Sequence, residues 1–151
     1  MMKFKLPRRS LIALSLCASS MSLVWAQADF AQQAAKEPGA RVTASGLVFK
    51  SLQDGQGASP VASDKVKVHY RGTLPDGKEF DSSFKRNQPI DFPLNAVIPC
   101  WTEGVQLMKV GGKAKLTCPP AIAYGSRGAG GVIPPNATLQ FEVELIAIAG
   151  K

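Results

Sequence analysis

The chain has 151 residues, of which 45% are hydrophobic and 19% charged, a composition typical of one globular domain and not of a disordered chain. The formal net charge is +7, but the first nine residues alone contain four Lys or Arg. The other 14 of the 18 Lys and Arg residues face 11 Asp and Glu residues, which argues against a nucleic-acid-binding surface.

Residues 1–28 are expected to be a secretory signal peptide. The basic start "MMKFKLPRR" is followed by the apolar run "SLIALSLCASSMSLVW" and by the small-residue tripeptide "AQA". We expect cleavage after Ala26 or Ala28, by the Sec route or, given the paired arginines of "PRRSLI", by the twin-arginine route. The mature protein is therefore expected to be exported, to the periplasm in a Gram-negative host.

Retention at the membrane is the less favoured interpretation of the same leader. The apolar run is short and rich in Ser for a spanning helix, so we expect no stable membrane span once the leader is cleaved. Lipid anchoring at Cys17 is disfavoured because the preceding residue, Leu16, is bulky. A lipid-anchored or a fully secreted form remains the alternative.

The mature chain begins with residues 29–44, which mix helix formers with a Pro-Gly break and predict a flexible N-terminal arm or a short helix. From Ser45, apolar and polar residues alternate in "GLVFKSLQDG", "DKVKVHYRGTL", "KAKLTC" and "ATLQFEVELIAIA", which predicts strands. A turn and short strand follow from "PDGKEFDSS", and "WTEGVQLMKVGG" has helical spacing up to its Gly pair. Residues 45–151 are thus expected to form one α+β domain, an antiparallel sheet with one short helix.

Familiar motifs of covalent and metal chemistry are missing from the sequence. There is one histidine, His69, and no Gly-x-Ser-x-Gly, His-Glu-x-x-His, Walker or Gly-x-Gly-x-x-Gly motif. A metal site is disfavoured because Cys100 and Cys118 lie far apart and no second histidine exists, and we expect no cofactor. What remains is a set of aromatic residues, each of which taken alone is best interpreted as core.

Four segments together resemble the FKBP-type peptidyl-prolyl cis/trans isomerases. They are "VHYRGTLPDGKEFDSS", "RNQPIDF", "VIPCWTEGVQLMKVGGKAKLT" and "PPAIAYGSRGAGGVIPPNATLQFEVEL", and they agree with the family in order and spacing over about residues 45–148. The resemblance implies a twisted antiparallel sheet wrapped around one short helix, with an apolar pocket between them.

The resemblance also implies the residues of the site. Trp101 is expected to form the pocket floor, and Tyr124 to donate a hydrogen bond to the substrate. Ile90 stands where the family commonly has Phe, and Cys100 where it usually has Gly. The implied catalytic residues are Tyr70, Phe80, Asp81, Trp101, Tyr124 and Phe141, and the implied substrate-binding residues are Arg86, Ile90, Val97, Ile98 and Ile133.

A disulfide between Cys100 and Cys118 is expected on the same basis. The resemblance places Cys100 at the start of the helix and Cys118 at the end of the strand on which the helix packs. Exported proteins commonly contain disulfides, and Cys17 leaves with the leader, so an even pair remains. Two buried, unpaired thiols are the alternative.

The expected function is to accelerate rotation about X-Pro bonds of exported proteins during folding, by non-covalent stabilisation of the twisted amide. Such a reaction breaks no bond, so it needs no nucleophile. The alternatives are a non-catalytic chaperone or binding module for Pro-containing segments, and a surface protein whose pocket is incidental. Expected partners are Pro-containing polypeptides and the macrolide inhibitors of the family, and a monomer is expected because the arm is too short for a long helical dimerisation domain.

Overall fold

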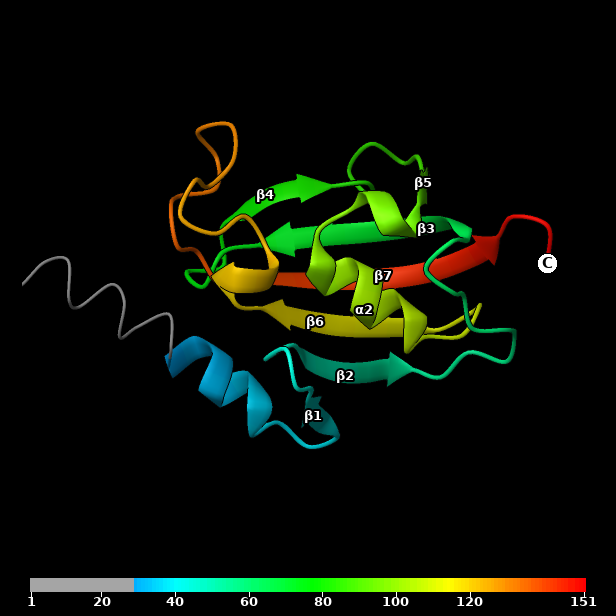
Figure 1. The fold of residues 1–151 in the computed structure, drawn as a ribbon, viewed down its shortest axis with the longest axis horizontal. Coiled ribbons are helices and arrows are strands. Elements are labelled where there is room, and N and C mark those ends of the chain that lie inside the picture. The colour runs from blue at the N-terminus through cyan, green and yellow to red at the C-terminus, as the bar shows by residue number, and fades with distance from the viewer. Residues whose placement is uncertain (1–28) are drawn as a thin grey trace, which may run out of the picture.

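The computed structural model describes residues 29–151, in which one antiparallel sheet carries a short helix across one face (Figure 1). The strand order is β1-β2-β6-β7-β3-β4. β5 also pairs with β3, along its first half, whereas β4 pairs with the end of β3. The predicted α+β fold is confirmed. The strands are β1 (Ala40–Val42), β2 (Val48–Gln53), β3 (Lys65–Thr73), β4 (Glu79–Ser82), β5 (Ile90–Pro93), β6 (Lys113–Cys118) and β7 (Leu139–Ile148).

The two long strands β3 and β7 form the middle of the sheet. Along β3, Val66, Val68 and Tyr70 are buried and alternate with more exposed side chains, as expected for a strand with one face on the core. β7 follows the same rule and pairs with β3 from Val66 to Thr73. The buried face of this pair is the surface on which the helix packs.

Helix α2 (Pro99–Gln106) begins and ends earlier than the sequence predicts. Pro99 fits the first turn because no intrahelical partner is needed there for a backbone N–H. Gly104 permits close packing, because a Cβ added there would lie 2.8 Å from the side chain of Leu116 on β6. The helix stops at Gln106 and not at the Gly pair, and the chain then runs through irregular structure and turns to Gly111, which has a positive φ of +89°.

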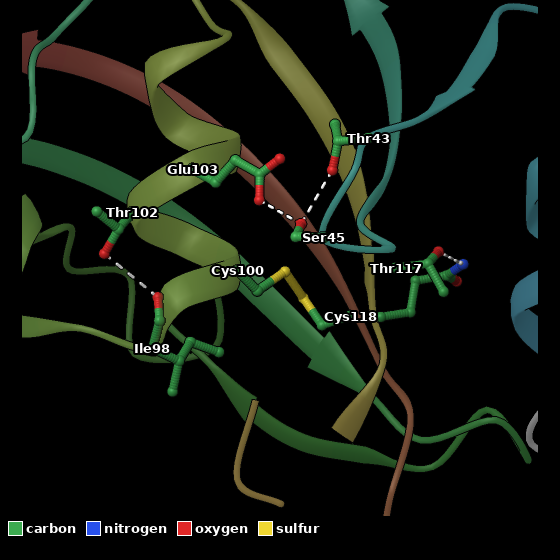
Figure 2. Close-up of a disulfide and its surroundings, with 9 residues drawn as sticks. Thr43, Ser45, Ile98, Cys100, Thr102, Glu103, Thr117 and Cys118 are labelled. Carbon is green, nitrogen blue, oxygen red and sulfur yellow. Dashed lines mark hydrogen bonds between the residues drawn. A yellow bond between two sulfur atoms is a disulfide. The ribbon is translucent and has the colours of Figure 1, made fainter. Parts of the chain in front are cut away.

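A disulfide between Cys100 and Cys118 joins α2 to the end of β6, as expected (Figure 2). The two Cα atoms are 5.8 Å apart, and both side chains are fully buried. Close to the disulfide in Figure 2, the Ser45 hydroxyl donates a hydrogen bond of 2.5 Å to the Glu103 carboxylate. The helix is therefore connected to the sheet by a covalent bond and to the β1–β2 turn by a polar contact.

Within residues 29–44, predicted as a flexible arm or a short helix, the structure has the short helix and an added strand. Residues 29–35 are helical, and β1 pairs with β2 as the edge strand of the sheet. The Glu37 carboxylate accepts hydrogen bonds from the ammonium groups of Lys50 (2.9 Å) and Lys115 (2.6 Å). These long-range contacts are not visible in a sequence window, and they attach the segment to the sheet.

The chain also contains two short 3-10 helices. One, η1 (Leu94–Ala96), comes before α2, and the other, η2 (Pro120–Ile122), comes after β6. No helix within residues 29–151 combines the length and hydropathy that a membrane span requires. The expected signal peptide lies in residues 1–28, outside the described residues, and the domain boundaries stay predictions.

Candidate functional site

An aromatic pocket of about 610 Å³ lies between α2 and the sheet, within the size range of small-molecule and peptide sites. Its wall on the sheet comes from β3, β4, β5 and β7, and its other side from η1, the start of α2 and the loop after β6. The lining residues are Tyr70, Phe80, Asp81, Ile90, Phe92, Ala96, Val97, Ile98, Trp101, Tyr124 and Phe141.

Trp101 forms the centre of the aromatic wall. Its ring centroid lies 5.2 Å from Tyr70, 5.3 Å from Phe92 and 5.3 Å from Phe141. The contacts with Tyr70 and Phe141 are edge-to-face, a favoured arrangement that fixes the indole plane. Trp101 lies one residue after the disulfide-bonded Cys100, so the same helical turn carries the pocket wall and the covalent link to β6.

One carboxylate, Asp81 on β4, lies at the edge of this apolar pocket. The Tyr70 hydroxyl donates a hydrogen bond to one of its oxygens, and the Arg86 guanidinium donates a 2.6 Å bond to the other. A second guanidinium nitrogen of Arg86 donates to the Tyr70 hydroxyl oxygen at 3.1 Å. The three side chains thus form a closed polar network that orients the Tyr70 ring in the pocket.

The network sets the protonation of its members. Partial burial disfavours the charged Asp81, but the hydrogen bonds from Tyr70 and Arg86 outweigh it and lower the pKa of this carboxyl below its ordinary value. Burial, followed by the bond to the Asp81 carboxylate, raises the pKa of Tyr70. At neutral pH the site therefore holds an ionised Asp81 and a protonated Tyr70.

The backbone of Tyr70 is held by a residue that sequence reasoning missed, Ser83. The buried Ser83 hydroxyl accepts a hydrogen bond of 2.7 Å from the Tyr70 N–H, and the Ser83 N–H donates to the Tyr70 carbonyl at 3.0 Å. The His69 Nδ1 lies 2.9 Å from the same hydroxyl, and the His69 ring stacks on Phe84. The lone histidine therefore packs beside the start of the β4–β5 connection and does not line the pocket.

The structure brings together most of the site residues implied by the resemblance, with two exceptions. Arg86 does not line the pocket and reaches it through Asp81. Ile133 is buried in the core and lines a separate groove. Sequence reasoning missed two lining residues, Phe92 and Ala96. Phe92 could have been found from its position two residues after Ile90 on β5, where alternate residues share a face.

The pocket contains no arrangement for covalent or metal chemistry. Within residues 29–151, no group of three His, Cys, Asp or Glu side chains could hold a metal ion. The only titratable groups among its lining residues are Asp81, Tyr70 and Tyr124. What the pocket can do is bind an apolar ring and present polar groups at its edge.

A short helix across a twisted antiparallel sheet, with an aromatic pocket between them, defines the class of prolyl-binding isomerase domains that the sequence resembled. The sequence profile of the family described as "FKBP-type peptidyl-prolyl cis-trans isomerase" matches residues 56–146. The chain belongs to this family.

Individual relatives agree with this assignment. FkpA, an FKBP-type peptidyl-prolyl cis-trans isomerase of Escherichia coli K12, is 49% identical over 120 residues, which cover 80% of this chain and 44% of FkpA. FkpA of Aeromonas hydrophila is 58% identical over 114 residues, covering 76% of this chain and 42% of the relative. The chain spans about half the length of these relatives.

Solved structures show the same fold. The crystal structure of Escherichia coli FkpA superposes with a TM-score of 0.79 at 48% identity, covering 81% of this chain and 57% of FkpA. A peptidyl-prolyl cis-trans isomerase from Pseudomonas syringae pv. tomato gives a TM-score of 0.79 at 40% identity, covering 89% of this chain and 98% of that chain.

Proposed function

We propose that this protein is an exported peptidyl-prolyl cis-trans isomerase that accelerates rotation about X-Pro bonds in exported polypeptides during folding. The observation that carries the proposal is the aromatic pocket closed by Trp101, with the Tyr70–Asp81–Arg86 network at its edge. Family membership supports the same activity.

The reaction requires that the enzyme favour the twisted amide over the planar one. The barrier to rotation about a peptide C–N bond is about 18–20 kcal/mol, and the uncatalysed X-Pro isomerisation takes tens to hundreds of seconds. Rotation breaks the conjugation of the imide, so the carbonyl oxygen carries less negative charge in the twisted state. A pocket that excludes water disfavours the more polar planar amide, and a gain of about 7 kcal/mol corresponds to about five decades in rate.

The residues of the pocket have distinct roles in this mechanism. Trp101 and Phe141 would contact the proline ring, because their edge-to-face packing forms one side of the cavity. Tyr124 is 40% exposed and lies at the pocket mouth, where its hydroxyl can donate to a substrate carbonyl. Asp81 would act by orienting Tyr70 and by placing a negative charge beside the rotating amide.

Export is proposed from the leader sequence together with the disulfide. Disulfides form and persist mainly in oxidising compartments, and the pair Cys100–Cys118 is bonded in this fold. The periplasm of a Gram-negative host is the compartment that we propose. Cell fractionation with mass analysis of the mature N-terminus would test it, and a protein found with residues 1–28 intact and reduced cysteines would contradict it.

The activity is tested by measuring the isomerisation rate of a short X-Pro peptide with the purified protein. We expect catalysis by the wild type and at least a tenfold lower kcat/KM for Trp101→Leu. Phe49→Leu is the matched control, because Phe49 is a buried aromatic residue on β2 outside the aromatic pocket. Its kcat/KM should stay within about twofold of the wild type.

A folded wild-type protein that fails to accelerate isomerisation would overturn the enzyme proposal. If the same protein binds Pro-containing peptides in an equilibrium titration, it is a binding module and not a catalyst. If Trp101→Leu and Phe49→Leu lose activity equally, the loss reflects fold stability and not the pocket.

Two narrower parts of the proposal concern ligands and assembly. We propose that the family's macrolide inhibitors occupy the same pocket, with weak affinity because Ile90 fills less of one wall than Phe. Ile90→Phe should therefore tighten macrolide binding several-fold, as measured by calorimetry.

We also propose that the protein is a monomer, which sedimentation analysis would test.

A further inference from the structure

A second groove, of about 500 Å³, lies beside the aromatic pocket and plays no part in the mechanism above. One wall is the β3–β4 turn, and the other is the loop between β6 and β7, which rises next to the start of β4 in Figure 1. The lining residues are Leu74, Asp76, Lys78, Arg127, Ala129, Gly130, Gly131, Val132, Ile133, Pro134 and Pro135.

Both walls of this groove are closed by their own backbone hydrogen bonds. In the turn, the Leu74 N–H donates to the Lys78 carbonyl at 2.8 Å. In the loop, Ala129 and Ile133 exchange two backbone hydrogen bonds of 2.9 and 3.0 Å, which presents Val132 at the tip with 55% of its surface exposed. The groove is therefore formed before any ligand arrives, and apolar side chains such as Leu74 and Ile133 make up part of its lining.

The charges of the groove are predominantly positive. Among the ion pairs of residues 29–151, none involves Lys78 or Arg127. The one acidic lining residue, Asp76, accepts the backbone N–H of Lys78 at 2.9 Å within the turn. Glu79, the next acidic side chain along β4, is already paired with Arg71 and Lys85. Two exposed cations thus face the groove without a partner carboxylate.

The groove adjoins the aromatic pocket through two chain segments. Lys78 lines the groove, and Phe80, two residues later, lines the pocket. Tyr124 lines the pocket, and Arg127, three residues later, lines the groove. Because an extended chain advances about 3.3 Å per residue, a substrate with its proline in the pocket reaches the groove within about two to four residues.

We propose that this groove is a subsite for an acidic residue of the substrate polypeptide, located two to four residues from the isomerised proline. The subsite rests on the proposed isomerase function and adds a substrate preference to it. Lys78 and Arg127 attract the carboxylate, while Leu74, Val132 and the two prolines contact its neighbours. Such a contact is made equally in the ground state and the transition state, so it lowers KM and leaves kcat unchanged.

The experiment uses pairs of X-Pro peptides that differ only by Glu or Gln, placed two, three or four residues before or after the proline. We expect one placement of Glu to raise kcat/KM about threefold over Gln through KM, as for a partly exposed ion pair. The advantage should disappear in 1 M salt, where the Debye length is about 3 Å. Equal kcat/KM values for every Glu and Gln pair would overturn the proposal.

Charge reversal distinguishes a specific subsite from a general attraction. The double variant Lys78→Glu/Arg127→Glu should lose the preference for Glu and prefer a peptide with Lys at that position. The matched control is Lys65→Glu, since Lys65 is also exposed but starts β3, at the opposite end of the strand from the turn. A control that changes the Glu preference as much as the double variant would show long-range attraction only, and would overturn the subsite.

The same peptides also separate failure of the subsite from failure of the isomerase function. With the Gln peptide, absence of catalysis by the wild type would count against the proposed function alone. The affinity of labelled Glu and Gln peptides, measured by fluorescence anisotropy, still tests the groove in that case. Tighter binding of the Glu peptide that is lost in the double variant would support the subsite, and equal affinities would overturn it.

Discussion

Helix α2 and the N-terminal segment 29–42 are attached to the same sheet by different interactions. The helix is held by the Cys100–Cys118 disulfide and by buried side chains such as Val105. The N-terminal segment is held by the short strand β1 and by the ion pairs of Glu37 with Lys50 and Lys115. The element that carries the pocket wall therefore depends on interactions insensitive to salt, whereas the peripheral segment depends partly on charge.

The same two regions can be compared through one carboxylate in each, Asp81 beside the pocket and Glu37 in the N-terminal segment. Asp81 and Glu37 each accept hydrogen bonds from two side chains, and each has a lowered pKa. Asp81 lines an aromatic cavity, whereas Glu37 lines no cavity among those described and only pairs with lysines on the sheet. A paired carboxylate is thus no sign of function by itself, and the cavity beside it decides its role.

The largest expected effect is on stability and comes from removing the disulfide. The two cysteines are separated by 18 residues in sequence, and in the chain-entropy model a loop of this size contributes about 3 kcal/mol. We expect Cys100→Ala/Cys118→Ala to lower the free energy of unfolding by about that amount in urea titrations. Activity at low temperature should change less than twofold, because packing of Val105 and the Ser45–Glu103 hydrogen bond still hold α2.

Reduction of the wild type provides the control for this prediction. Reductant with denaturant present should bring the wild-type unfolding curve close to that of the double variant, and should leave the double variant itself unchanged. A folded double variant with at least tenfold lower kcat/KM would show that the disulfide positions Trp101, and would contradict a purely stabilising role.

The next effect is on activity and separates the two carboxylates. Asp81→Asn removes the negative charge and leaves one acceptor oxygen where the carboxylate has two, so Tyr70 and Arg86 lose one of their two acceptors and the Tyr70 ring is less well oriented. We expect kcat/KM to fall about tenfold, which is about 1.4 kcal/mol. Glu37→Gln removes a similar charge far from the pocket and should leave kcat/KM unchanged in the same isomerisation assay.

A third variant sharpens this contrast within the network. Arg86→Lys keeps the positive charge but cannot donate to Asp81 and the Tyr70 hydroxyl through two fixed nitrogens. If Arg86→Lys retains full activity while Asp81→Asn does not, the charge of Asp81 matters and the orientation of Tyr70 does not. If Asp81→Asn and Arg86→Lys are both as active as the Glu37→Gln control, Asp81 has no role in the reaction.

Sequence patterns predicted the parts of the fold whose local periodicity matches their burial. β3 and β7 bury alternate side chains, and β6 does so in its first half, so their alternation was readable. β2 was predicted from alternating apolar and polar letters, although it buries only Val48 and Phe49 at its start. β1 and β5 were missed because three and four residues are too few for a period, and β4, which also has four, was predicted only with the help of the Pro-Asp-Gly turn before it. The helix was predicted too long because apolar residues in the turns after Gln106 continue its spacing.

The site could be predicted only through the family resemblance, and not completely. Phe92 alone resembles any core aromatic, and its position in the pocket depends on the pairing of β5 with β3. Ile133 was assigned to the pocket, yet the short hairpin closed by Ala129 buries it in the core. The bond from Tyr70 to Asp81 requires the β3–β4 register that pairs Gly72 with Asp81, and an irregularity between Gly72 and Thr73 sets that register, which the alternation of the sequence does not reveal.

The smallest expected effect concerns the charged attachment of the N-terminal segment. The hydrogen bonds from Lys115, and then from Lys50, lower the pKa of Glu37 below its ordinary value of 4.5. A lowered pKa in the folded state means that the ionised form stabilises the fold above about pH 4.5, and that this contribution is lost as pH falls through the folded pKa. We expect Glu37→Gln to lower the free energy of unfolding at pH 7 by about 0.5–1 kcal/mol, because the ion pairs are partly exposed.

The difference between wild type and Glu37→Gln should then shrink on acidification and in high salt. Urea titrations at pH 7 and at about pH 3 measure it directly, with Lys67→Gln as a control for loss of one charge without an ion pair among residues 29–151. A stability difference that persists unchanged at pH 3 would show that β1 pairing, and not the ion pairs, attaches the segment. In that case the contrast with α2 would be between a disulfide with buried side chains and the pairing of a short edge strand, because charge would no longer distinguish the two attachments.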